Sequence, residues 1–146
     1  MKAVALVVDD SRVMRNIVMK ELRNAGLADF EFVEAEDGED ALKKFNPSKI
    51  DIAFVDWNMP KMSGIDFVRK VRKMPQAKNT PLVMVTSEKT VGKIEEALDQ
   101  AGANAYISKP FTAETLQRKL APLMKQIEEN QASRGGGGGF FSKLMR

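Results

Sequence analysis

The chain has 146 residues with 23 basic and 20 acidic side chains, and it contains neither cysteine nor histidine. This length suits one domain with its own core. The missing residue types exclude disulfides and thiolate chemistry, and they remove the commonest metal ligand and general base. The basic excess comes from Arg134, Lys143 and Arg146 near the C-terminal end, so the sequence does not indicate a domain-wide basic surface for nucleic acid.

The N-terminal stretch "MKAVALVVDD" carries a short apolar run that ends in two acids. The run is too short for a signal peptide or a membrane span. We therefore expect a cytoplasmic protein with no membrane span.

Along the chain, short apolar runs alternate with helical patterns of hydrophobic residues. The predicted strands are 3–8, 30–35, 52–55, 81–85 and 105–108. The predicted helices are 11–25, 38–45, 64–73, 91–101 and 112–130. The first, third and fourth runs are uninterrupted, as in strands that are buried on both faces. The alternation predicts an α/β fold with a five-stranded parallel sheet wrapped by helices.

Two local patterns give more specific expectations. The first helix should bury one apolar face and end at Gly26; that face is formed by Met14, Ile17, Val18, Leu22 and Ala25. The acidic run 34–40 lacks the alternating ligand spacing of a calcium loop, so it predicts a turn and a solvated helix start.

Polar side chains follow several predicted strands where each strand ends. They are Asp9 and Asp10, then Asp56, then Thr86, then Lys109. Ligands of open parallel sheets bind outside the carboxyl ends of the strands, so we expect these side chains to converge. Three carboxylates repel one another unless a cation intervenes, and oxygen ligands alone favour Mg²⁺ or Mn²⁺.

Such a site has the parts of a phosphoryl-transfer centre. A metal ion, the Lys109 ammonium and the Thr86 hydroxyl together can hold the charged oxygens of a phosphoryl group. In this interpretation Asp56 is the nucleophile and forms an acyl phosphate.

The motifs "VVDDS", "FVDWNMPKMSG", "VMVTSE" and "GANAYISKPFT" occur in this order over most of the chain. With them, roughly residues 4 to 125 resemble response-regulator receiver domains, most closely the stand-alone chemotaxis receivers of the CheY kind. The resemblance implies a flavodoxin-like (βα)5 fold with strand order 2-1-3-4-5, for which CheY is a standard example.

The resemblance also assigns roles to individual residues. It implies that Asp56 is the phosphoacceptor and that Thr86 and Lys109 bind the phosphoryl oxygens. It implies a Mg²⁺ site made by Asp10, Asp56 and the Asn58 backbone carbonyl, with Asp9 acting through a water.

Three further roles follow from the same resemblance. Tyr106 would be an aromatic switch that turns inward when Thr86 moves. Asn58 and Glu88 would modulate dephosphorylation, and the Lys109–Pro110 peptide would be cis.

The function implied is a single-domain response regulator that is not a turnover enzyme. A sensor histidine kinase of the chemotaxis type would phosphorylate Asp56, and the face formed by the fourth helix, fifth strand and fifth helix would change. The output partner implied is the flagellar motor switch, with a phosphatase as a further partner.

Other interpretations remain open at this point. Taken singly, Asp9 and Asp10 fit a helix cap, Thr86 fits another cap, Lys109 fits a solvated loop and Tyr106 fits a packed strand aromatic. A phosphate-sink or non-motor receiver would look nearly the same. An Asp-nucleophile phosphohydrolase needs two acids separated by one residue, and a flavin carrier needs a Ser/Thr-rich loop where this chain has acids.

The C-terminal part differs in composition from the rest. We predict a receiver domain at 1–130, followed at 131–146 by a Gly-rich flexible linker and an apolar-basic peptide, "FFSKLMR". We expect this peptide to act as a tethered docking segment, either for a partner at the output face or for the receiver's own groove. The alternative is a tail with no function.

Overall fold

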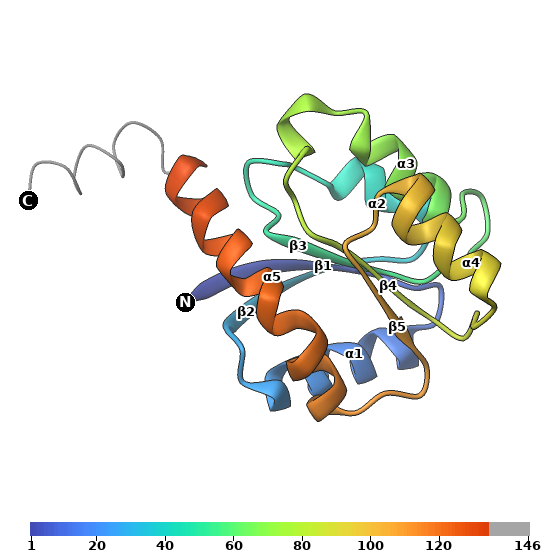
Figure 1. The fold of residues 1–146 in the computed structure, drawn as a ribbon, viewed down its shortest axis with the longest axis horizontal. Helices are drawn as coiled ribbons and strands as arrows, with labels where there is room; N and C mark the ends of the chain where they lie inside the picture. The colour runs from blue at the N-terminus through green and yellow to red at the C-terminus, as the bar shows by residue number, and fades with distance from the viewer. Residues whose placement is uncertain (135–146) are drawn as a thin grey trace, which may run out of the picture.

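The computed structural model describes residues 1–134 and contains one sheet with helices on both faces (Figure 1). The strands are Lys2–Val8 (β1), Asp29–Ala35 (β2), Ile52–Val55 (β3), Leu82–Thr86 (β4) and Ala105–Ser108 (β5). All neighbouring strands pair in parallel, in the order β2-β1-β3-β4-β5. The predicted fold class and strand order are confirmed.

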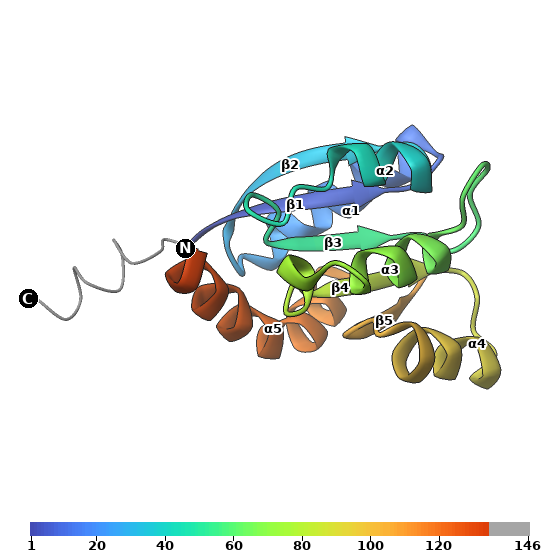
Figure 2. The ribbon, with the colours of Figure 1, turned by 90° about the horizontal axis from the view of Figure 1, so that it is seen from above.

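The helices divide between the two faces of the sheet. They are Arg12–Ala25 (α1), Gly38–Lys44 (α2), Gly64–Arg72 (α3), Val91–Glu95 (α4) and Ala113–Arg134 (α5). A 3₁₀ turn, Pro75–Ala77, follows α3, and a π-helical segment, Glu96–Ala101, continues α4. Helices α1 and α5 cover one face of the sheet, and α2, α3 and α4 cover the other (Figures 1 and 2).

The central strands are buried because helices cover both of their faces. Every residue of β3 and β4 is buried, which explains their uninterrupted apolar sequences. Alternate side chains supply two separate cores: Phe54 faces the α1 and α5 side, whereas Ala53 and Val55 face the other. The sheet is therefore a rigid support for the residues that follow its strands.

Helix α1 begins and ends where the sequence predicted, but its buried face is different. Ser11 accepts a hydrogen bond from the Met14 N–H, and Gly26 ends the helix with φ of 68°. The prediction for Ile17 was wrong, since this side chain is 41% exposed while Met19 is buried. The side chains buried from α1 are Val18, Met19, Leu22 and Ala25, so the apolar stripe is rotated away from Ile17.

The acidic run before α2 is also less solvated than expected. Asp37 is buried, and its carboxylate accepts a hydrogen bond from the Asp40 N–H at 2.8 Å as the N-cap of α2. The Lys61 ammonium lies 3.8 Å from the same carboxylate and offsets part of its charge. The expectation of a solvated helix start was thus wrong for Asp37.

Helix α5 extends past the expected domain boundary at residue 130, as far as Arg134. Its Arg134 guanidinium pairs with the buried Asp51 carboxylate and donates to the carbonyl of Ile50. The end of α5 is thereby attached to the sheet edge opposite the ends where Asp9 and Asp56 lie. The predicted docking segment and most of its linker lie outside the described residues. No helix within residues 1–134 has the length and apolarity needed to cross a membrane.

Candidate functional site

Three carboxylates converge at the carboxyl edge of the sheet. Asp9 and Asp10 follow β1, and Asp56 follows β3, the neighbouring parallel strand. One carboxylate oxygen from each lies within 4.8 Å of the others. Asp9 is buried, Asp56 is partly buried and Asp10 is exposed. An all-oxygen donor set that is open to solvent on one side suits a hard divalent cation, so this cluster could hold a metal ion.

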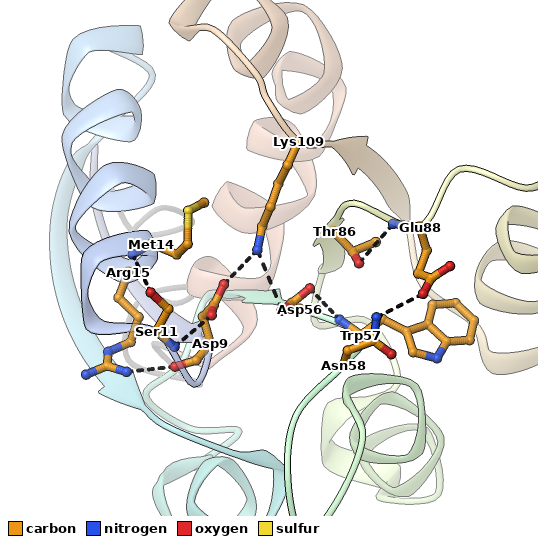
Figure 3. A network of polar contacts seen from close by, with 10 residues as sticks. All are labelled: Asp9, Ser11, Met14, Arg15, Asp56, Trp57, Asn58, Thr86, Glu88 and Lys109. Atoms are coloured by element: carbon orange, nitrogen blue, oxygen red, sulfur yellow. Dashed lines mark hydrogen bonds and ion pairs between the residues drawn. The ribbon is translucent and has the colours of Figure 1, made fainter.

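Lys109 brings a positive charge to the same cluster. Its ammonium lies 2.8 Å from Asp9 Oδ2 and 3.6 Å from Asp56 Oδ2, between the two carboxylates (Figure 3). The side chain is 16% exposed, so solvent screens these pairs less than it screens a surface pair. The Lys109–Pro110 peptide that follows β5 is cis, as the resemblance to receiver domains implied.

Opposing effects act on the pKa of the Asp56 carboxylate. Burial raises its pKa above the ordinary aspartate value, and the nearby Asp9 charge raises it further. The Lys109 ammonium opposes both effects, and so do hydrogen bonds from the Thr86 side chain and the Trp57 N–H, which donates to Oδ1 at 2.8 Å. Lys109 therefore favours the ionised form that a nucleophilic carboxylate needs.

Glu88 connects the other side of the site to β5. Its backbone N–H donates to Thr86 Oγ1 at 3.3 Å, and its carboxylate accepts from Asn58 Nδ2 at 2.9 Å (Figure 3). Its backbone carbonyl accepts a hydrogen bond from the Tyr106 hydroxyl. Thr86, Asn58 and Tyr106 are thus tied to one residue, and Tyr106 is already buried in this structure.

The structure brings all the expected site residues into two connected groups. Asp9, Asp10, Asp56 and Lys109 form the charged group; Asn58, Thr86, Glu88 and Tyr106 form the hydrogen-bonded group. The two groups meet where Thr86 and the Trp57 N–H reach the Asp56 carboxylate. The roles assigned to these residues stay predictions.

Sequence reasoning missed three residues that support this site. Arg15 donates to the Asp9 carbonyl at 2.7 Å, and the Lys93 ammonium lies 4.5 Å from the centre of the Trp57 ring. Gly64 packs so closely that a Cβ there would lie 1.8 Å from the Asp56 carbonyl oxygen. The glycine in "KMSGIDF" marks a tight approach, but the sequence does not name the atom it approaches.

The hydrogen-bonded group can be tested by titrating Tyr106, the single tyrosine of the chain. Burial, and then the charges of Glu88 and Asp56, raise its pKa to about 12. Ultraviolet absorbance should show phenolate forming about two pH units above a free tyrosine, and Glu88→Gln should lower the midpoint. Because the phenol ionises more easily in the unfolded chain, stability should fall between pH 10 and 12. A midpoint at the free value would contradict the buried position of the ring.

Comparison with known proteins agrees with this geometry. The family model described as the response regulator receiver domain matches residues 5–121. The chemotaxis protein CheY of Pseudomonas aeruginosa is 41% identical over 122 residues, which cover 84% of this chain and 96% of that protein. Chemotaxis protein CheY-3 of Vibrio cholerae is 42% identical, with 84% of this chain and 92% of that protein covered.

Solved structures give the same result. The chemotaxis response regulator CheY4 of Vibrio cholerae has a TM-score of 0.73 at 38% identity, with 84% of this chain and 99% of that chain covered. A CheY-like receiver domain protein from Methanospirillum hungatei has a TM-score of 0.74 at 25% identity, with 88% and 98% covered.

Proposed function

Because the chain belongs to the response regulator receiver family and is a receiver domain of the CheY type, we propose that it is a switch controlled by phosphorylation of Asp56. Such receivers are signalling domains and not classical enzymes. The observation that carries the proposal is the position of the Asp56 carboxylate, 3.6 Å from the Lys109 ammonium and beside two further acids.

The proposed chemistry is a single transfer to the chain itself. An oxygen of Asp56 attacks the phosphorus of a phosphohistidine on a sensor kinase. The new O–P bond makes an acyl phosphate, the P–N bond breaks, and the imidazole leaves with the electron pair. Lys109 is placed to pair with a phosphoryl oxygen as the charge moves outward from Asp56.

The acids fit the divalent cation that this chemistry requires. Asp10, Asp56 and the Asn58 backbone carbonyl would hold Mg²⁺, with Asp9 acting through a water. When bound, Mg²⁺ supplies positive charge that offsets the charge of the phosphoryl oxygens. The carboxylates of Asp9 and Asp10 then serve to hold the cation beside the nucleophile.

The hydrogen bonds around Glu88 give a route from the site to an output face. The Thr86 hydroxyl accepts from the Glu88 N–H, and its one hydrogen, which reaches the Asp56 carboxylate, would pass to a phosphoryl oxygen. Movement of Thr86 toward that oxygen would shift the Glu88 backbone, whose carbonyl holds Tyr106. Tyr106 lines a groove with Ile94, Leu98, Ala105, Ser108 and Lys119, contributed by α4, the π-helical segment, β5 and α5.

We assign this face to a protein partner. The CheY relatives favour a chemotaxis kinase as the phosphodonor and the flagellar motor switch as the output, with a phosphatase as a further partner. A protein with these partners acts in the cytoplasm.

The direct test of phosphorylation is incubation with acetyl phosphate and Mg²⁺, followed by intact-mass spectrometry. One added phosphate per chain is expected, and an unchanged mass would overturn the proposal.

The metal site makes a separate prediction for thermal stability. Mg²⁺ at about ten times its dissociation constant should add about 1.4 kcal/mol to the free energy of unfolding, a shift of a few degrees in Tm. EDTA should remove this gain, and Asp10→Ala should make the melt insensitive to EDTA. Differential scanning calorimetry measures both effects. Equal melts of the native chain with and without Mg²⁺ would show that the acids do not form a metal site.

The lifetime of the phosphorylated form gives a further prediction. Asn58 and Glu88 are hydrogen-bonded to each other at the edge of the site, where water would approach the acyl phosphate. Both residues resemble those of chemotaxis receivers that lose their phosphoryl group rapidly, so we expect self-hydrolysis within seconds to a minute. The decay of the phosphorylated mass after removal of the donor, with Mg²⁺ present, measures it. A form that persists for hours would argue against a rapid-response role.

A further inference from the structure

Every polar group of Asp9 is held in place. Its N–H donates to the Ala35 carbonyl at 3.1 Å, and its two carboxylate oxygens accept from the Ser11 N–H at 2.9 Å and the Lys109 ammonium at 2.8 Å. The remaining group, the backbone carbonyl, accepts from Arg15 Nη1 at 2.7 Å. Of these contacts, the one from Arg15 reaches the peptide that joins the two acids, and the mechanism above gives it no role.

The Arg15 guanidinium is itself fixed at two points. Its side chain is 13% exposed, and while Nη1 holds the Asp9 carbonyl, Nε donates to Glu34 Oε1 on β2 at 2.9 Å (Figure 3 shows the contact with Asp9). A guanidinium carries several donors in one rigid plane, so both contacts form together. A lysine offers a single ammonium on a flexible stem and cannot reproduce this pair of contacts.

The contact between Arg15 and the Asp9 carbonyl can control the position of the Asp10 carboxylate. Asp10 is exposed, and within residues 1–134 its carboxylate makes no hydrogen bond or ion pair. Its position therefore depends on the backbone that leads into it. The peptide between the two acids is planar, so the Asp9 carbonyl oxygen and the Asp10 Cα belong to one rigid unit.

We propose that Arg15 is a positioning residue: by holding the Asp9 carbonyl, it sets the orientation of the Asp9–Asp10 peptide and so places the Asp10 carboxylate in the metal-binding cluster. The inference rests on the proposed function, in which these acids hold Mg²⁺. Groups that orient metal ligands affect metal affinity strongly, typically by about 10- to 100-fold when removed.

The test is a Mg²⁺ titration of the full chain, followed by the fluorescence of Trp57. This is the single tryptophan of the chain, and its backbone N–H donates to the Asp56 carboxylate. Arg15→Ala and Arg15→Lys should each weaken Mg²⁺ affinity about tenfold or more. Arg12→Ala is the matched control, because it removes one positive charge from an exposed position on the same helix. It should change affinity by less than about twofold.

Repeating the titration at high salt distinguishes an effect of Arg15 geometry from an effect of its charge. An effect of charge shrinks as ionic strength rises, whereas the loss in Arg15→Lys should persist at high salt because this variant keeps the charge. Wild-type affinity in Arg15→Lys would overturn the inference, because the paired contacts of the guanidinium would then not be needed to place Asp10.

A second variant covers the case in which the Arg15 variants do not fold, as judged by circular dichroism in EDTA. Glu34→Gln loosens the second anchor of the guanidinium without touching the acids, and it should weaken Mg²⁺ affinity by a smaller factor. Unchanged affinity in Glu34→Gln would then overturn the inference. A wild-type chain that shows no saturable response to Mg²⁺ would overturn the metal site itself, a result distinct from the failure of Arg15 alone.

Discussion

Asp56→Asn should abolish labelling by acetyl phosphate while the chain still folds. The amide has almost the shape of the carboxylate, so the packing at the end of β3 is kept, but it cannot form an acyl phosphate. Intact-mass spectrometry should show about one phosphate on the native chain and none on the variant. Asp66→Asn is the matched control, because Asp66 is an exposed aspartate on α3 and its loss should leave labelling unchanged. Equal labelling of the native chain and Asp56→Asn would show that another residue is the acceptor.

The same substitution should raise stability near neutral pH. Burial raises the pKa of Asp56, so ionising this carboxylate costs more in the folded state than in the unfolded state. The cost is fully present above the raised pKa, and it disappears as the pH falls below the ordinary aspartate value, where the group is protonated in both states. Asp56→Asn should therefore melt higher than the native chain at pH 7 in EDTA, and the difference should shrink with acidification. A variant that melts lower at pH 7 would mean that Lys109 outweighs the burial.

Residues that lie at strand ends were predictable because the parallel order of the strands brings those ends together. Asp9, Asp56 and Lys109 are far apart in sequence, yet each follows a buried apolar run, and that pattern can be read directly. The end of α1 at Gly26 was predictable for a different reason, since local chemistry determines a helix C-cap.

Residues whose role depends on a tertiary contact were not predictable in this way. Ile17 fits the helical period as well as Met19 does, and only packing on the sheet decides which is buried. Asp37 looks like any acid in a charged run until Lys61 and the start of α2 surround it. Arg15 contacts a backbone carbonyl, a partner that every residue offers, so no side-chain pattern marks it.

Gly64→Ala should cause a large loss of stability, although it removes no contact and only adds a methyl group. Gly64 begins α3, and its N–H donates to the Trp57 carbonyl at 2.9 Å, which brings the helix start against the chain that leaves β3. A methyl group there would lie 1.8 Å from the Asp56 carbonyl oxygen and 2.8 Å from a Val55 methyl carbon. Neither the buried strand end nor the helix start can yield easily, because both are held by backbone hydrogen bonds.

We expect Gly64→Ala to lower the free energy of unfolding by about 3 kcal/mol or more and Tm by roughly 10 °C. Since the displaced atom belongs to Asp56, the fraction that stays folded should also be labelled more slowly by acetyl phosphate. Gly92→Ala is the matched control: this glycine is exposed in α4, no atom lies within 4 Å of its added Cβ, and alanine should stabilise the helix by up to about 1 kcal/mol. Urea denaturation of both variants measures the two effects. If Gly64→Ala proved as stable as Gly92→Ala, the close approach of α3 to Asp56 would not exist in solution, and the rigid placement of the proposed nucleophile would need another cause.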